Sequence, residues 1–187
     1  PYEAVAIVGL GLMGGSLALS LKRAGYAGRI LGVSRPETVA EARRLGAIDE
    51  GFTYEQLASA VEPSRLIVLA SPISAIIKHL EALGGPGVKL RPGAVVTDMG
   101  STKRAVVQAG QRLPGHVFFV GGHPLCGSEQ RGIAAADPFL FQNAYYVLTP
   151  APGVPSSEVE KLGRFLERTG ARMAVLTAVD HDHIAAT

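Results

Sequence analysis

His123 has the side chain best suited to proton transfer near neutral pH, because an unperturbed imidazole titrates at about pH 6.5. It follows the apolar run 117–120 and two glycines, and Pro124 comes directly after it. The proline restricts the histidine to an extended backbone, and the glycines allow a ligand or a neighbouring backbone to come close. The pattern predicts an acid–base residue at a strand end. The alternative is a loop histidine that hydrogen-bonds to a backbone carbonyl.

Ser101 is the second candidate for a direct chemical role, in the segment Asp98-x-x-Ser101-x-Lys103 after the apolar run 94–97. Its hydroxyl could donate to a substrate oxygen. It could instead cap a helix that begins near Lys103, since serine is a preferred N-cap residue. Asp98 could orient nearby backbone or simply end the strand. We expect Cys126 to be a small packed residue rather than a nucleophile.

A glycine-rich turn near the start of the chain fits the pattern G-x-G-x-x-G. A β-branched run precedes it and a stretch of helical composition follows it, as dinucleotide-binding turns require. In such turns the glycines permit a tight turn, the approach of a pyrophosphate and close helix packing, and the helix N–H groups hold the anion. A turn that binds nothing is the alternative. The predicted cofactor contacts are Gly9, Gly11, Leu12, Met13 and Gly14.

Ser34 and Arg35 stand about 20 positions after the glycine turn, where an NAD site places a carboxylate on the ribose hydroxyls. Neither residue is a carboxylate. A hydroxyl and a guanidinium would bind the 2′-phosphate that a carboxylate would repel. We therefore expect NADP in preference to NAD. The alternative is an ordinary surface arginine at a strand end.

Strand-like and helical segments alternate along the chain. The strand-like runs are 5–8, 29–33, 66–70, 94–97, 117–120, 145–148 and 173–176, and the helical stretches are 12–24, 38–45, 75–83, 103–113 and 156–169. This alternation predicts an α/β fold, a doubly wound, mainly parallel Rossmann-type sheet with helices on both faces. Strand ends line the ligand crevice of such sheets, so we expect Ser71 and Pro72 to contact the cofactor as well.

The composition is that of a folded chain, with 47% of its 187 residues hydrophobic and 18% charged. No basic run accompanies the formal charge of +2, so we expect no nucleic-acid partner. The stretch 4–21 has eighteen uncharged residues, but its four glycines would break a helix, and we expect no membrane span. A single cysteine favours a reducing compartment, the cytoplasm. We expect no metal at 180–183, because alternating residues of a helix do not share a face.

Several segments, in order, resemble the prephenate/arogenate dehydrogenase family of tyrosine biosynthesis. They are GLGLMGGSLA at 9–18, D-x-x-S-x-K at 98–103, GGHPLCGSE at 121–129, LF at 140–141, LTP at 148–150 and DHDH at 180–183. Together they extend over essentially the whole chain. The GGHP and GSE pair after D-x-x-S-x-K is far more specific than the glycine turn.

The resemblance implies an enzyme that oxidises prephenate or arogenate with NAD or NADP, and that releases CO₂ as the ring becomes aromatic. It implies that His123 accepts the proton of the C4 hydroxyl while a hydride leaves C4. It also implies that Ser101 lies beside that hydroxyl and the nicotinamide. The Ser34-Arg35 pair resembles the NADP-using members.

The sequence departs from the family pattern in two ways. Leu125-Cys126 stands where many members have Met-Ala. Family chains also continue after DHDH into S-H-L-P-H and a helical dimerisation domain, which supplies an arginine for the substrate. We therefore expect an NADP-binding domain at 1–176 and the truncated start of a helical domain, without packing partners, at 177–187. The longer protein is expected to be a homodimer.

Two other functions stay open. A β-hydroxyacid dehydrogenase also opens with G-x-G-x-M-G, but it would show a GxxG segment after the fourth strand, where GGHP stands here. A non-catalytic NADP-binding module is the second alternative, and the presence of both His123 and Ser101 argues against it.

Overall fold

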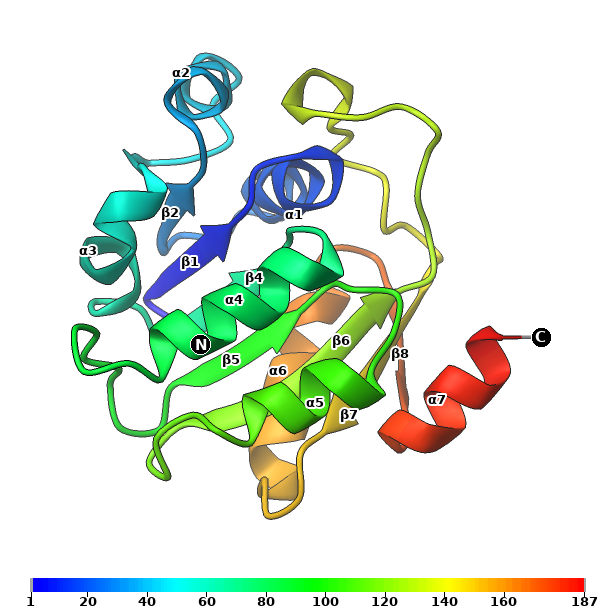
Figure 1. Ribbon diagram of the computed structural model, residues 1–187. Helices are drawn as coiled ribbons and strands as arrows, with labels where there is room; N and C mark the ends of the chain where they lie inside the picture. Colours follow the sequence, from blue (N-terminus) through cyan, green and yellow to red (C-terminus); the bar gives the residue numbers. More distant parts are fainter. Residues whose placement is uncertain (1, 187) are drawn as a thin grey trace.

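The strands form one eight-stranded sheet in the computed structural model, which describes residues 2–186 (Figure 1). The first residue of the predicted domain 1–176 and the last of the segment 177–187 lie outside the described residues. The order is β3-β2-β1-β4-β5-β6-β7-β8, parallel except for the pair β6–β7. The strands are β1 (Ala4–Val8), β2 (Arg29–Val33), β3 (Glu50–Phe52), β4 (Leu66–Leu69), β5 (Val95–Asp98), β6 (Phe118–Pro124), β7 (Tyr145–Pro150) and β8 (Arg172–Val175). The predicted doubly wound, mainly parallel Rossmann-type sheet is confirmed.

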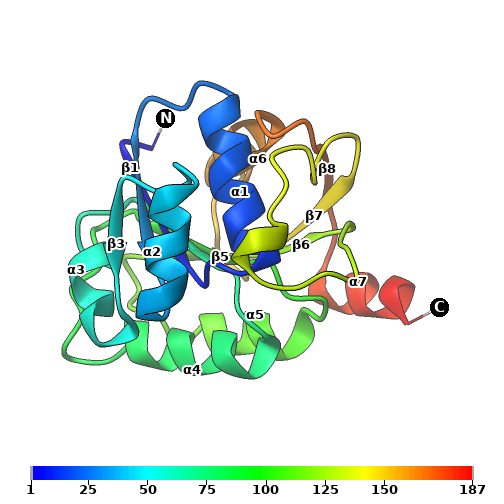
Figure 2. The ribbon, with the colours of Figure 1, turned by 90° about the horizontal axis from the view of Figure 1, so that it is seen from above.

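Helices cover both faces of the sheet (Figure 2). They are α1 (Leu12–Arg23), α2 (Pro36–Arg44), α3 (Leu57–Val61), α4 (Ile73–Leu83), α5 (Arg104–Gly110), α6 (Ser156–Glu167) and α7 (Ala178–Ala185), with 3₁₀ turns at Tyr54–Gln56 and Ile133–Ala135. Val5 and Ile7 of β1 enter a core with α1 and α6, whereas Ala6 and Val8 enter a second core with α3, α4 and α5. Successive side chains of a strand point to opposite faces, so a fully apolar strand fits a sheet covered on both sides.

The strand order changes direction between β1 and β4. Strands β2 and β3 lie on one side of β1, and β4, β5 and β6 lie on the other. Ligands of doubly wound sheets bind at this switch point, outside the carboxyl ends of the strands. The predicted site residues that follow β1, β2, β4 and β5 therefore lie along the edge of the sheet formed by the carboxyl ends of these strands. His123, near the end of β6, lies at the same edge.

Strand β6 is longer than the sequence predicts, and His123 lies within it rather than after it. Its neighbour across the antiparallel pair is Val147 of β7, which supplies backbone partners to the GGHP segment. The alternative of a loop histidine is therefore wrong. The sequence analysis also missed β3 and α3, because three and five residues are too few to show a periodic pattern.

The prediction that the segment after residue 177 lacks packing partners is wrong. Helix α7 lies against α5 and β7 (Figure 1), and its His181 is only 2% exposed. The uncharged stretch 4–21 is divided among β1, the glycine turn and α1. Among the described helices, none combines the length and the apolar character that crossing a membrane requires.

Candidate active site

The turn between β1 and α1 requires two of its glycines. Gly9 has a φ of +96°, and a Cβ there would lie 2.6 Å from Ser71 Oγ and 2.8 Å from the Ala70 carbonyl oxygen. A Cβ on Gly14 would lie 1.9 Å from the Gly9 carbonyl oxygen. The first turn of α1 therefore packs directly on the loop, which fixes the amino end of the helix beside the carboxyl end of β1.

Gly11, in contrast, faces open space. A Cβ built on it would meet no atom within 4 Å. Gly11 is the N-cap of α1, and the first turn of this helix carries no acidic side chain. Its N–H groups and the positive end of the helix dipole are thus available to an anion. These residues fit the pyrophosphate of a dinucleotide.

A groove of about 350 Å³ lies beside the turn, and four predicted cofactor residues line it. The lining residues are Leu12, Met13, Ala70, Ser71, Pro72, Gly127, Ser128, Gln130, Arg131 and Gly132. The last five come from the long connection between β6 and β7. Three larger hollows, of about 760, 570 and 440 Å³, lie elsewhere and are lined by none of the predicted site residues. Size alone therefore does not mark the site.

Ser34 and Arg35 directly follow β2, and they differ in exposure. Ser34 is 5% exposed, and its N–H donates to the Phe52 carbonyl at 3.1 Å. The Arg35 side chain is 75% exposed, and its Nε lies 3.4 Å from Glu37 Oε1. An ion pair this exposed contributes little stability, so the guanidinium can turn to a stronger anion.

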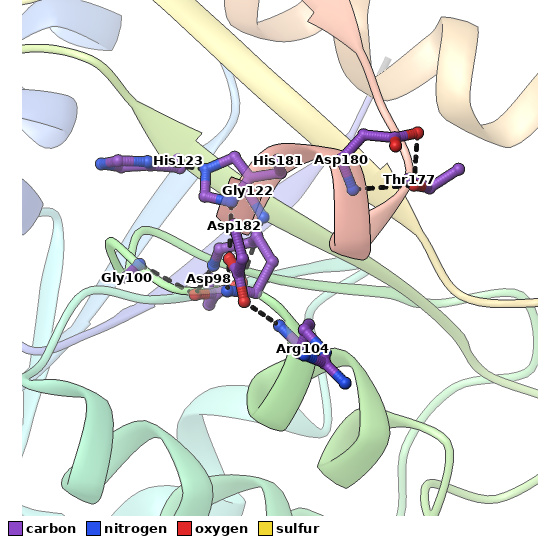
Figure 3. A network of polar contacts seen from close by, with 10 residues as sticks. Asp98, Gly100, Arg104, Gly122, His123, Thr177, Asp180, His181 and Asp182 are labelled. Atoms are coloured by element: carbon purple, nitrogen blue, oxygen red, sulfur yellow. Dashed lines mark hydrogen bonds and ion pairs between the residues drawn. The ribbon is translucent and has the colours of Figure 1, made fainter. Parts of the chain in front are cut away.

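Asp98 is a fully buried carboxylate at the end of β5 that ties the loop after β5 to strand β6 (Figure 3). Its Oδ2 accepts from the Gly100 N–H at 2.8 Å, and its Oδ1 accepts from the Gly122 N–H at 3.1 Å. The fully buried Lys103 forms an ion pair with it. Burial raises the pKa of Asp98 and lowers the pKa of Lys103, against the mutual attraction of the two charges. Lys103 is thus a structural anchor.

Ser101 and His123 directly follow the two glycines that Asp98 anchors, which brings both candidates to the same part of the edge. Ser101 is exposed, and the N-cap of α5 is Lys103, so the capping alternative for Ser101 is wrong. A Cβ on Gly122 would lie 2.5 Å from the Asp98 carbonyl oxygen. This glycine therefore serves the close approach of neighbouring backbone.

His123 is the last member of a chain of polar contacts that begins on α7 (Figure 3). Its Nδ1 lies 2.8 Å from His181 Nε2, and His181 Nδ1 lies 2.8 Å from Asp182 Oδ1. Burial lowers the pKa of His123 to about 4; His181 and Lys103 act in the same direction and Asp182 opposes them. The imidazole is therefore neutral at pH 7, the form that can accept a proton.

Sequence analysis missed three residues at this edge: Arg131 in the groove, and His181 and Asp182 beside His123. The DHDH segment enters the sequence analysis as a possible metal cluster and as part of the family resemblance, and neither predicts a contact with His123. Among the described residues, no three His, Cys, Asp or Glu side chains are grouped to hold a metal ion. Cys126 packs against the apolar core, and burial raises its pKa to about 11, so it stays a thiol.

Comparison with known proteins gives a consistent set of matches. A family sequence model described as prephenate dehydrogenase, nucleotide-binding domain, matches residues 17–175. Prephenate dehydrogenase of Bacillus subtilis (strain 168) is 37% identical over 184 residues, covering 97% of this chain and 48% of the relative. The chain thus spans about half the length of the curated relatives it matches.

Two solved structures are similar over nearly the whole chain. The crystal structure of prephenate dehydrogenase from Aquifex aeolicus, in complex with hydroxyphenyl propionate and NAD⁺, has a TM-score of 0.87 at 32% identity. It covers 97% of this chain and 62% of that one. Synechocystis arogenate dehydrogenase has a TM-score of 0.87 at 36% identity, covering 98% of this chain and 63% of that one.

Proposed function

The chain belongs to the prephenate dehydrogenase family, and we propose that it supplies the dinucleotide-binding half of an enzyme that oxidises prephenate or arogenate and releases CO₂. The observation that carries the proposal is the anchoring of Ser101 and His123 by one buried carboxylate, at the strand edge that also holds the glycine turn. The family match goes against the β-hydroxyacid dehydrogenase alternative.

In the proposed reaction, the neutral His123 accepts the proton of the C4 hydroxyl of the substrate. The Ser101 hydroxyl hydrogen-bonds to the same oxygen and fixes its distance from the imidazole. As the O–H electrons form a C4 carbonyl, a hydride leaves C4; a bound nicotinamide supplies the acceptor. The C1–carboxylate bond then breaks, CO₂ leaves, and its electrons pass through the ring to give a phenolate. The imidazolium returns its proton to the phenolate oxygen, so the protein mainly positions and transfers one proton.

We propose NADP as the preferred cofactor. Ser34 and Arg35 at the end of β2 support this choice, because neither is the carboxylate that would repel a 2′-phosphate. Glu37 opposes it, since a phosphate must displace this carboxylate from Arg35. The groove residues Ser71 and Arg131 would face the remainder of the dinucleotide.

The proposal extends to the domain organisation, the oligomeric state and the pathway of the whole protein. We propose that residues 1–176 form the cofactor domain, that 177–187 begin a helical part, and that a longer homodimeric protein acts in the cytoplasm in tyrosine biosynthesis. The test is steady-state kinetics of the longer protein, with prephenate and arogenate each paired with NADP and NAD. Reduced cofactor and CO₂ should form in equal amounts. No turnover with either substrate would leave the alternative of a non-catalytic NADP-binding module.

A further inference from the structure

Two side chains of α7, His181 and Asp182, form a series of polar contacts with His123, and neither lines the cofactor groove. His181 is 2% exposed, and its ring meets that of His123 edge to face, with centroids 5.1 Å apart. Its backbone N–H donates to the Thr177 carbonyl at 2.9 Å, which is a regular contact of the first helical turn. The imidazole position is thus set by the helix as well as by the ring contact.

Asp182 is held in place as a hydrogen-bond acceptor. Its Oδ1 accepts from the Lys103 N–H at 2.7 Å, and its Oδ2 accepts from the Arg104 N–H at 2.9 Å. Partial burial acts to raise the pKa of Asp182, but these N–H groups and the His181 ring hold it below its ordinary value. The carboxylate is therefore ionised at neutral pH and can only accept hydrogen bonds.

These contacts determine which ring nitrogens of His181 and His123 carry a proton. Because Asp182 can only accept, the proton of a neutral His181 ring is on Nδ1, and its Nε2 carries a lone pair. The partner of that lone pair is His123 Nδ1, at 2.8 Å, which must then carry the proton of the His123 ring. The Nε2 of His123 is left unprotonated, and among residues 2–186 it has no hydrogen-bond partner.

We propose that His181 and Asp182 are positioning residues that hold His123 in the Nδ1–H tautomer, with the Nε2 lone pair directed at the substrate. A histidine free in water prefers the opposite, Nε2–H form, which would present a proton where a base is needed. When Nε2 takes up a proton, Asp182 also stabilises the resulting positive charge, in the manner of the aspartate of a catalytic triad. The catalytic consequence rests on the proposed function, whereas the tautomer itself does not.

The tautomer can be measured on this 187-residue chain without substrate. In the ¹⁵N-labelled protein at neutral pH, the correlations between ring nitrogens and ring carbon-bound protons distinguish a protonated Nδ1 from a protonated Nε2. We expect Nδ1–H at His123 in the wild type. His181→Phe keeps an aromatic ring but removes the acceptor, and it should convert His123 to Nε2–H. His183→Phe, an exposed position on the same helix, is the matched control and should leave the wild-type pattern.

An Nε2–H signal for His123 in the wild type would overturn the proposal, and so would an unchanged tautomer in folded His181→Phe. The wild-type measurement decides the matter even if that variant does not fold. In a preparation that turns over prephenate or arogenate, His181→Phe should lower kcat about 10- to 100-fold with little change in KM for the cofactor. His181→Gln, whose amide oxygen can accept the Nδ1 proton, should recover part of this loss. If no preparation turns over, the proposed function fails while the tautomer result stands.

Discussion

At His123, the surroundings favour the neutral imidazole, as a general base requires. Replacing it in the longer protein by His123→Asn keeps a polar group in β6 but removes the proton acceptor. Loss of a general base costs about 10²–10⁴ in rate, so kcat should fall by that factor while cofactor affinity stays nearly constant. Steady-state kinetics and a cofactor titration measure the two quantities. A kcat within threefold of the wild type would end the assignment.

The same histidine predicts a pH dependence of stability. Burial lowers its pKa to about 4 in the folded chain, whereas an unfolded histidine titrates at about 6.5. Between these values the unfolded state binds more protons, so the free energy of unfolding must decrease as the pH falls from about 6.5 to about 4. Only the wild type carries this histidine, so in urea denaturation its free energy of unfolding should decrease more than that of His123→Asn as the pH is lowered from about 7 to about 4. Parallel pH dependence of the two proteins would contradict the lowered pKa.

At the residue scale, the proposed preference for NADP depends on Arg35. A charge-assisted hydrogen bond to a 2′-phosphate contributes roughly 1.5–3 kcal/mol, so Arg35→Ala should weaken NADP binding about ten- to a hundredfold. NAD has no such phosphate, and its affinity should barely change. Calorimetric titration of both cofactors tests the expectation. Arg44→Ala, an exposed arginine at the other end of α2, is the matched control. Equal affinities of the wild type for NAD and NADP would refute the preference.

At the scale of elements, the β1–α1 turn contains one glycine that the fold requires, Gly14, and one that we assign to cofactor binding, Gly11. Gly14→Ala would place a Cβ 1.9 Å from the Gly9 carbonyl oxygen, so it should destabilise the fold and abolish cofactor binding together. Gly11→Ala places its Cβ in open space, so stability should stay within about 0.5 kcal/mol of the wild type. The same methyl group would occupy the space we assign to the pyrophosphate. NADP affinity should therefore fall in Gly11→Ala without the loss of stability expected for Gly14→Ala, which denaturation and calorimetry can establish.

The elements that sequence analysis located are those whose pattern is local. The range 29–33 agrees with β2 to the residue, and most other predicted strands and helices agree within a few residues, because apolar runs and capping residues signal them directly. The longer extent of β6 could not be read this way, since its second half, GGHP, is strand only because β7 pairs with it. Tertiary pairing overrides the low strand propensity of glycine and proline here.

The candidate site likewise has residues that the local sequence pattern predicts and residues that it does not. His123, Ser101 and the glycine turn were predicted because each follows an apolar run that ends at the ligand edge. The contact of His123 with His181 joins positions 58 apart in sequence, and nothing in the local pattern indicates it. The same holds for Asp182, whose carboxylate accepts from the N–H groups of Lys103 and Arg104 at the start of α5, 79 and 78 positions away. Long-range side-chain contacts depend on how α7 packs, which the sequence pattern does not contain.

At the scale of the whole molecule, we expect the cofactor site to be complete in this chain and the substrate site to be incomplete. The residues we assign to the dinucleotide are all present in the described chain and lie along one strand edge. The proposed substrate, prephenate or arogenate, is an organic anion that needs a cationic partner and a second wall to exclude water. The basic residue nearest in sequence to Ser101 is Lys103, which is fully buried and paired with Asp98. Beside His123, Leu125 is 50% exposed, so this side of the histidine is open.

This difference predicts that the 187-residue chain binds NADP but does not turn over prephenate or arogenate. Binding should be seen in a calorimetric titration and should be lost in Gly14→Ala. Reduced nicotinamide should not accumulate above the background with either substrate, whereas the longer protein should produce it. Helix α7 does not lack partners in the chain, so an inactive result cannot be ascribed to an unformed His123–His181 contact, and the tautomer measurement checks that point. Turnover by the 187-residue chain comparable to that of the longer protein would place the whole substrate site within residues 1–187, with Ser101 and His123 on one wall and α7 as the second.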